Sequence, residues 1–181
     1  MRIIAGKFGS RSLSAPAGMA TRPMADKVRG AMFDALGDVT GFVVLDVYAG
    51  SGAIGLEALS RGASSVDALE TGGQAQAVIL KNVSELGVAA DFHLYKAGVE
   101  RWLKFPEQQQ PAPRYNLITA DPPYDKLDVG ILGQLAGFLL AGGQMVVSHS
   151  SRQPSPDVKS LELEKTKTYG DSALSFYNRS S

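Results

Sequence analysis

A glycine-rich turn is the first place in the sequence where residue types and spacing indicate chemistry. Gly50, Gly52 and Gly55 stand in G-x-G-x-x-G spacing directly after the apolar run Phe42–Asp46. Glycines in this position permit a tight turn and let a ligand approach the backbone closely. The residues after Gly52 are Ala-Ile rather than Lys-Ser/Thr, which excludes a phosphate-binding P-loop. The turn predicts a nucleotide-containing ligand, with a strand-to-helix turn that binds nothing as the alternative.

Two acidic residues beside this turn distinguish between the ligands it could hold. Glu70 ends a second apolar run, 18 residues beyond Gly52, where an acid holds ribose hydroxyls in dinucleotide and S-adenosylmethionine sites alike. Asp46, four residues before Gly50, would repel a pyrophosphate and better suits the amino and sulfonium groups of S-adenosylmethionine. A methyl donor is therefore favoured. For Asp46 the alternative is a turn aspartate that accepts hydrogen bonds from local backbone N–H groups.

A second turn, Asp121-Pro-Pro-Tyr124, ends the apolar run that begins at Tyr115. Its prolines fix φ and bias Asp121 toward an extended conformation, which makes the turn rigid. Hydrogen bonds to Asp121 and to the Pro122 carbonyl would localise the lone pair of a nucleobase amine and aim it at a methyl group, while Tyr124 stacks on the base. We therefore expect Asp121, Pro122 and Tyr124 to be catalytic in amine methylation, without a metal. A stiff loop without a ligand is the alternative.

The elements around these turns predict an α/β fold with a mostly parallel sheet. Short apolar runs alternate with segments of helical period. Strands are expected at residues 42–46, 65–70, 92–95, 115–121 and 143–148. Helices are expected at 73–86 and along a face formed by Ile131, Leu132, Leu135, Phe138 and Leu139. In a parallel sheet ligands bind beyond the carboxyl ends of the strands, so Asp46, Glu70 and Asp121 should lie along one edge.

The last part of the sequence predicts an antiparallel hairpin that closes the sheet. Leu161–Lys167 alternates at period two, Tyr169-Gly-Asp has turn composition, and Ala173–Tyr177 resumes the alternation. The hairpin belongs to the larger of two expected units, residues 41–181.

The composition fits one domain of ordinary size and excludes wholesale disorder. Hydrophobic residues make up 44% of the 181, and charged residues 20%. The absence of cysteine excludes disulfides and thiolate chemistry. The sequence opens with no signal peptide and contains no apolar run long enough to span a bilayer, so we expect a cytoplasmic protein.

The charge distribution singles out the N-terminal region. Eighteen Lys and Arg balance eighteen Asp and Glu, which excludes a uniformly basic chain. Residues 1–30, however, hold six Lys and Arg against one acid, Asp26, and this predicts an anionic partner. Residues 1–40 are expected to form a basic extension in which Arg2, Lys7 and Arg11 contact RNA phosphates.

Two segments make up this extension. The stretch from Gly6 to Pro23 predicts a short hairpin or irregular arm outside the core. A helix follows it, marked by the apolar residues Val28 and Met32, and it ends near Gly37.

These motifs resemble those of the class I S-adenosylmethionine-dependent methyltransferases. The sequence is most similar to the bacterial 16S rRNA guanine-N2 methyltransferases of the ribosomal small subunit methyltransferase D family. The resemblance covers nearly the whole chain. It rests on Arg2–Lys7, Thr21–Pro23, Asp26–Arg29, Phe33, Leu45–Ala63, Glu70, Asp121–Tyr124 and Tyr169–Leu174.

The resemblance implies a Rossmann-like, seven-stranded sheet with a C-terminal antiparallel hairpin, and S-adenosylmethionine as the cofactor. The substrate it implies is 16S rRNA in an assembled or assembling small ribosomal subunit, bound by a monomer. Arg22 and Pro123 are implied to lie near that RNA. The implied cofactor-binding residues are Asp46, Tyr48, Ala49, Gly50, Ser51, Gly52, Glu70 and Thr71. Relatives place an acid after the third strand to accept from the adenine amine, but Ala97-Gly98 stands there. Backbone groups are expected to recognise the adenine instead.

Two other functions are compatible with these residues. The Asp-Pro-Pro-Tyr turn equally suits an adenine-N6 methyltransferase acting on DNA or RNA. A catalytically silent RNA-binding assembly protein could keep the same fold, although Asp121 and Gly50-Ser-Gly52 are intact.

Overall fold

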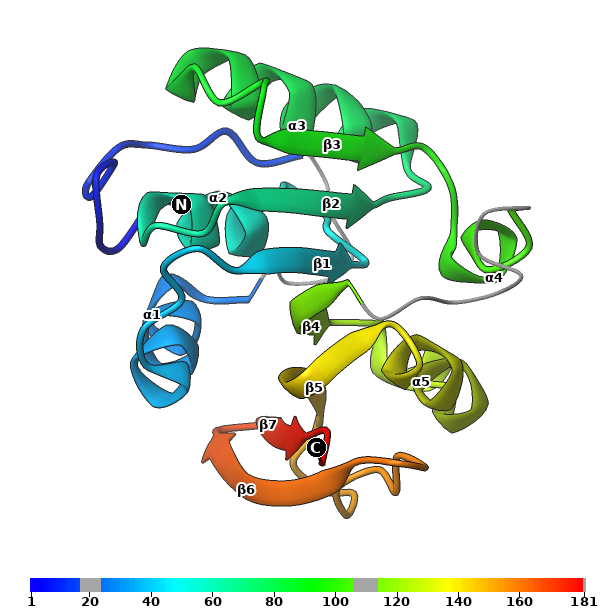
Figure 1. Ribbon diagram of the computed structural model, residues 1–181. Coiled ribbons are helices and arrows are strands. Elements are labelled where there is room, and N and C mark those ends of the chain that lie inside the picture. The colour runs from blue at the N-terminus through cyan, green and yellow to red at the C-terminus, as the bar shows by residue number, and fades with distance from the viewer. Residues whose placement is uncertain (17–23, 106–113, 181) are drawn as a thin grey trace.

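A computed structural model describes residues 1–16, 24–105 and 114–180. Within these residues seven strands form one sheet in the order β3-β2-β1-β4-β5-β7-β6 (Figure 1). Strands β1 to β5 are parallel, and β7 pairs antiparallel with both β5 and β6. The predicted mostly parallel sheet with its C-terminal antiparallel hairpin is therefore confirmed. The strands are β1 (Val43–Val47), β2 (Ser65–Leu69), β3 (Phe92–Tyr95), β4 (Tyr115–Ala120), β5 (Leu139–Ser150), β6 (Glu162–Tyr169) and β7 (Ser172–Asn178).

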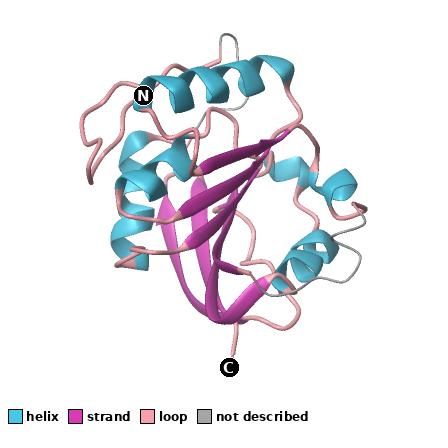
Figure 2. Ribbon diagram, turned by 45° about the horizontal axis from the view of Figure 1, so that its top comes forward, coloured by secondary structure: helices cyan, strands magenta, loops and turns pink. Residues whose placement is uncertain are grey.

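Helices cover both faces of the sheet. Figure 2 shows α1, α2 and α3 on one face and α4 and α5 on the other. The inner strands are buried on both faces, which explains why they are continuous apolar runs in the sequence. The helices are α1 (Asp26–Leu36), α2 (Ala53–Ser60), α3 (Gly73–Leu86), α4 (Val99–Trp102) and α5 (Val129–Ala136). Among the described helices none has the length and apolar composition of a membrane span.

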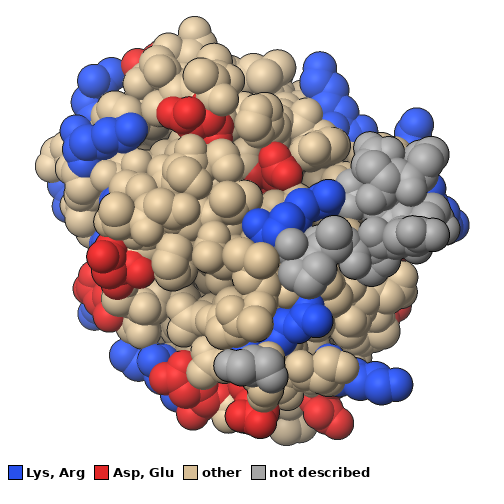
Figure 3. All heavy atoms as spheres, in the orientation of Figure 1, with Lys and Arg blue, Asp and Glu red and all other residues tan. Residues whose placement is uncertain are grey.

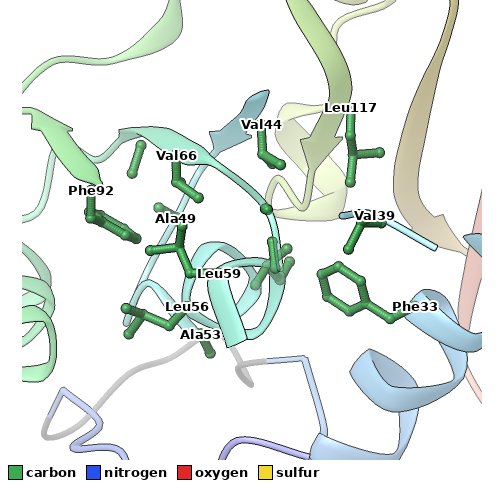
Figure 4. Packing of buried hydrophobic residues seen from close by; sticks show 14 of the residues in the cluster. Phe33, Val39, Val44, Ala49, Ala53, Leu56, Leu59, Val66, Phe92 and Leu117 are labelled. Atoms are coloured by element: carbon green, nitrogen blue, oxygen red, sulfur yellow. The ribbon is translucent and has the colours of Figure 1, made fainter. Parts of the chain in front are cut away.

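The larger core lies between the sheet and the first three helices. Phe33 of α1 and Leu56 and Leu59 of α2 pack toward Val44 of β1, and Phe92 of β3 closes the other side (Figure 4). Every residue of α2 is buried. The helix that carries the glycine turn is therefore fixed on all sides.

Residues 1–14 cover the outer side of α2. The backbone N–H groups of Ile4 and Ala5 donate to the Glu57 carboxylate at 2.7 and 3.0 Å. An antiparallel bridge between Arg2 and Ser12 folds the segment back on itself. The hairpin or irregular arm predicted for Gly6–Pro23 lies partly outside the described residues. The prediction that the stretch from Gly6 onward stays outside the core is wrong for Leu13, which is 6% exposed and belongs to the core.

The predicted helix face ending in Phe138 and Leu139 is also corrected. Helix α5 ends at Ala136, and Leu139 begins β5 and pairs with Tyr115 of β4. The strand therefore starts four residues before Gly143, where the sequence placed it. A Cβ atom on Gly143 would lie 2.8 Å from the Leu140 carbonyl oxygen, so the glycine permits an irregularity that shifts the β4–β5 register.

Candidate active site

A cavity of about 940 Å³ opens at the carboxyl ends of the parallel strands. Segments that are distant in sequence meet in its walls, among them Tyr48–Ser51, Glu70–Thr71, Asp121–Tyr124 and Tyr169–Ser172. This volume lies within the range of cavities that hold cofactor-sized ligands. Both predicted turns therefore face one cavity, as expected for the edge of a parallel sheet.

Glycine is required at the three positions of the first turn for two different structural reasons. Gly50 and Gly52 adopt φ values of 58° and 76°, in the left-handed region that favours glycine. Gly55 instead permits close packing, because a Cβ atom there would lie 2.7 Å from Val66 Cγ1. Tyr48, just after β1, has φ 65° and lines the cavity. A non-glycine residue in this conformation is uncommon and costly, and such residues are enriched at functional sites.

Glu70 joins the end of β2 to the glycine turn. Its Oε2 accepts from the Gly50 N–H at 2.8 Å, and its Oε1 accepts from the Gly72 N–H at 2.7 Å. A carboxylate offers about four acceptor sites, so both oxygens can still accept from ligand hydroxyls. Glu70 lines the cavity and is oriented before any ligand arrives.

Asp46 lies beneath the glycine turn and is not among the residues that line the cavity. Its Oδ2 accepts from the Gly55 N–H at 3.1 Å and its Oδ1 from the Thr119 hydroxyl at 2.9 Å. Burial raises the pKa of Asp46 to about 7, and the nearby charges of Asp121 and Glu70 add to that rise. Asp46 thus accepts a hydrogen bond from the backbone of the turn, which is the alternative that the sequence left open. A role of Asp46 toward a ligand stays a prediction.

Asp121 follows β4 and is partly exposed, toward the cavity. Burial raises the pKa of its carboxyl group above the ordinary value, and a hydrogen bond from Ser148 opposes that rise. Ser148 belongs to β5, is 3% exposed and also lines the cavity. An acceptor held in a fixed, partly desolvated position is what orientation of a nucleobase amine requires.

Tyr124 extends over the cavity from a single 3-10 turn, η2 (Tyr124–Lys126). It is 38% exposed, and its hydroxyl donates to Ser172 Oγ at 2.6 Å. The turn between β6 and β7, which the sequence placed at Tyr169-Gly-Asp, thus forms the cavity wall beside the proline-rich turn. The exposed ring offers a flat surface for a base.

Helix α1 and the two residues before it supply a further wall through Met24, Ala25, Val28 and Arg29. Arg29 is fully buried, pairs with Asp26 at 3.0 Å, and lies 3.6 Å from Glu57. Its guanidinium also donates to the Arg2 carbonyl. Within the described residues its Nη1 atom has no hydrogen-bond partner. A buried, unpaired N–H beside the cavity is suited to an anionic ligand group such as a carboxylate.

The cations assigned to RNA lie apart from the cavity lining. Arg2, Lys7 and Arg11 are exposed on the segment that covers α2, and none of them lines the cavity. Arg11 donates to the Glu85 carbonyl at 3.0 Å. Figure 3 shows Lys and Arg side chains at several separate places on one face rather than in one patch. The predicted substrate residue Arg22 lies outside the described residues.

Sequence reasoning missed three residues of this site, and each has a physical explanation. Arg29 was quoted for the basic excess and for the resemblance but was given no role in the site, and it pairs with Glu57 of another helix. Ser148 had no motif around it. Glu100 of α4 lines the cavity although it stands two residues after the position where an acid was sought. Within the described residues no group of His, Asp or Glu side chains is arranged to hold a metal ion.

The strand order, the glycine turn and the cavity define a Rossmann-like fold of the methyltransferase type. The chain belongs to the family described as conserved hypothetical protein 95, whose model matches residues 1–178.

Two named relatives and one solved structure match this chain over nearly its full length. "Putative rRNA methyltransferase YlbH" of Bacillus subtilis is 31% identical, over 99% of each chain. "Ribosomal RNA small subunit methyltransferase D" of Escherichia coli is 29% identical, over 99% of this chain and 90% of the relative. The solved structure of "Putative methyltransferase yhhF from Escherichia coli" has a TM-score of 0.87 at 27% identity, covering 100% of this chain and 98% of that one.

Proposed function

We propose that the protein transfers a methyl group from S-adenosylmethionine to the exocyclic N2 amine of a guanine in 16S ribosomal RNA. The names of the two curated relatives support methylation of ribosomal RNA. The observation that carries the reaction type is the shared cavity, in which Asp121 and Tyr124 face the glycine turn and Glu70. The guanine and its N2 amine come from the resemblance described above.

The residues around the glycine turn fit the cofactor. When bound, S-adenosylmethionine supplies an electrophilic methyl group on a sulfonium. Glu70 would accept from the ribose hydroxyls, and the unpaired Arg29 Nη1 would take the carboxylate of the amino-acid end. Asp46 would contribute indirectly: it accepts a hydrogen bond from the Gly55 N–H and so fixes the glycine turn that surrounds the cofactor. Backbone groups of the remaining cofactor-binding residues, Tyr48, Ala49, Gly50, Ser51, Gly52 and Thr71, would surround the ligand.

The proline-rich turn would position the amine. Asp121 and the Pro122 carbonyl would accept its two N–H groups, Tyr124 would stack on the base, and Pro123 would contact neighbouring RNA. Ser148 would keep the Asp121 carboxylate oriented. With its pKa raised by burial, Asp121 is also suited to receive the proton that the amine loses.

Residues 1–40 would act as the RNA-binding extension of a methyltransferase domain formed by residues 41–181. Arg2, Lys7, Arg11 and Arg22 would contact phosphates of the small subunit, where steering by charge is effective over about 8–10 Å at physiological salt. A ribosomal substrate places this activity in the cytoplasm, and we propose that a monomer performs it.

The proposal is tested with labelled S-adenosylmethionine and small ribosomal subunits that lack the modification. We expect label in 16S rRNA, recovered as N2-methylguanosine after digestion and mass spectrometry. Recovery of N6-methyladenosine, or labelling of naked DNA but not of the subunits, would instead establish the adenine-N6 alternative. Subunit binding without cofactor binding or label would identify a silent assembly protein.

A further inference from the structure

Asn82 lies on α3, is fully buried, and bonds two segments that are distant in sequence. Its Nδ2 donates to the Ser51 carbonyl of the glycine turn at 3.1 Å and to the Ser14 carbonyl at 3.1 Å. Its Oδ1 accepts from the Ser14 N–H at 2.8 Å. One side-chain amide therefore holds both the glycine turn and the end of the N-terminal segment, residues 1–14.

The bond to Ser51 affects the shape of the glycine turn directly. Helix α2 begins at Ala53. If the helix extended back to Ser51, the Gly55 N–H would donate to the Ser51 carbonyl, four residues earlier. Instead the Gly55 N–H donates to Asp46, and the Ser51 carbonyl accepts from Asn82. Two side chains thus bond the two groups that one helical hydrogen bond would join, and this keeps the turn out of the helix.

Burial makes the Ser51 carbonyl dependent on this donor. Ser51 is 5% exposed, and it lines the cavity. A buried carbonyl that loses its hydrogen-bond partner is unfavourable, so the backbone would shift to find another donor. The Gly55 N–H is the donor that a helix would offer, and a bond to it would close the turn. Without Asn82 we therefore expect the cavity wall at Ser51 to move.

The N-terminal segment reaches the same turn from both of its ends. Met1 Sδ accepts from the Ser51 hydroxyl at 3.2 Å, and the Met1 carbonyl accepts from the Leu13 N–H at 3.0 Å. Ser14 follows directly, and Asn82 bonds both of its backbone groups. The segment that carries the three cations proposed to contact RNA is thus held against the turn proposed to bind the cofactor.

We propose that Asn82 is a positioning residue that sets the glycine turn for the cofactor and holds the RNA-binding segment against that turn. It touches neither ligand, because it is fully buried and is not among the residues that line the cavity. This inference rests on the proposed function, since it takes S-adenosylmethionine and RNA as the two ligands. Loss of this one amide should weaken both binding events. The transfer step should change little, because it depends on the proline-rich turn.

Asn82→Ala tests this through binding constants that require no turnover. Isothermal titration calorimetry with S-adenosylhomocysteine should show binding about tenfold weaker than in the wild type, and filter binding to small ribosomal subunits should weaken about threefold to tenfold. In steady-state kinetics both KM values should rise while kcat stays within about twofold. A variant that is merely less stable would instead show fewer binding sites at an unchanged Kd, and that result would contradict a positioning role.

A second variant separates hydrogen bonding from packing. Asn82→Asp keeps the size and shape of the side chain but can supply at most one of the two donated hydrogen bonds. We therefore expect it to bind at least one of the two ligands more weakly than the wild type does. Binding of both ligands as in the wild type would show that Asn82 only fills space.

Asn116→Ala is the matched control. Asn116 also bonds the backbone through its side chain, because its Oδ1 accepts from the Val43 N–H at 2.9 Å. This bond lies where β1 and β4 begin, at the opposite end of the strands from the cavity. The control should lower the Tm and leave both Kd values unchanged.

The outcomes separate this inference from the proposed function. Unchanged Kd values for both ligands in Asn82→Ala would overturn this inference alone. Weaker binding of only one ligand in that variant would overturn the claim that Asn82 serves both. Failure of the wild type to bind S-adenosylhomocysteine or the subunits would overturn the proposed function, and this inference with it.

Discussion

The Tyr124 hydroxyl donates a 2.6 Å hydrogen bond to Ser172 Oγ and thereby joins two turns that are 48 residues apart. Tyr124 belongs to the proline-rich turn after β4, and Ser172 begins β7. The contact fixes a ring that is otherwise exposed. The C-terminal hairpin thus contributes to the cavity wall as well as to the sheet.

Removing either partner of this bond should have the same effect. Tyr124→Phe keeps the ring and Ser172→Ala keeps the turn, so each should lower kcat/KM about threefold to tenfold through looser positioning of the ring. Because both variants lose one shared interaction, the double variant should be no worse than either single variant. Steady-state kinetics on small subunits measures this. Additive losses would show that the two side chains act independently.

Asp121→Ala should abolish turnover and leave cofactor binding nearly intact. In the proposed mechanism the carboxylate faces the amine, whereas Glu70 and the glycine turn would hold the cofactor, so we expect a loss of at least about a thousandfold in kcat. Calorimetry with S-adenosylhomocysteine provides the control measurement. Activity like that of the wild type in this variant would remove Asp121 from the mechanism.

Ser148→Ala should change the pH dependence of the reaction. The ionised Asp121 is the better acceptor, so activity falls as the pH drops through its pKa. Burial already places that pKa above the ordinary carboxyl value, and the Ser148 hydrogen bond holds it down. Without Ser148 the acidic limb of the kcat/KM profile should move to higher pH. The difference in activity between the variant and the wild type should be smaller at high pH than on the acidic limb. An acidic limb at the same pH in both proteins would contradict the assignment.

Asp46 should make the folded protein less stable as the pH rises. Its pKa of about 7 in the fold lies above the ordinary value of 3.8, so the unfolded chain releases this proton at lower pH. The stabilising contribution of the protonated group is complete below about pH 4. It declines by about 1.4 kcal/mol per pH unit until the folded group ionises near pH 7.

Asp46→Asn removes this dependence and can still bond Thr119 and the Gly55 N–H. The Tm of the variant minus that of the wild type should therefore be larger at pH 8 than at pH 5, by differential scanning calorimetry. Parallel Tm curves across this range would show that Asp46 ionises normally in the fold.

Changing Arg2, Lys7 and Arg11 together to Ala should weaken RNA binding and make it less dependent on salt. Each lost phosphate contact lowers the slope of log K against log salt by about 0.7–0.9. Filter binding to small subunits at several salt concentrations measures the slope, and cofactor affinity should be unchanged. An unaltered slope would show that these side chains are only a solvated surface.

Much of the fold and of the site could be predicted because the responsible signals are local. The helix at 73–86 and the strand at 92–95 appear at the expected residues, since their apolar spacing is set by the face each element buries. The two turns were identified from glycine and proline, whose backbone preferences hold in any context.

The missed features depend on contacts between distant segments. Leu139 continues a helical spacing in the sequence, but its pairing with Tyr115 places it in β5. Arg29 is buried beside Glu57, which belongs to another helix. The sequence pattern of neither helix indicates that these two residues form an ion pair. Glu100 lies beside Gly98 because α4 begins between the two residues and brings the side chain back toward the cavity.

The place of β7 in the sheet has a consequence for how the protein is made. In the described sheet β6 pairs with β7 and with no other strand, although β6 comes first in the chain. During synthesis β6 therefore has no edge to join until β7 has left the ribosome. Until then β5 presents an open edge that invites association with other chains. Ser172 also reaches Tyr124 only at that moment, so the cavity wall beside the proline-rich turn is completed only when β7 has paired.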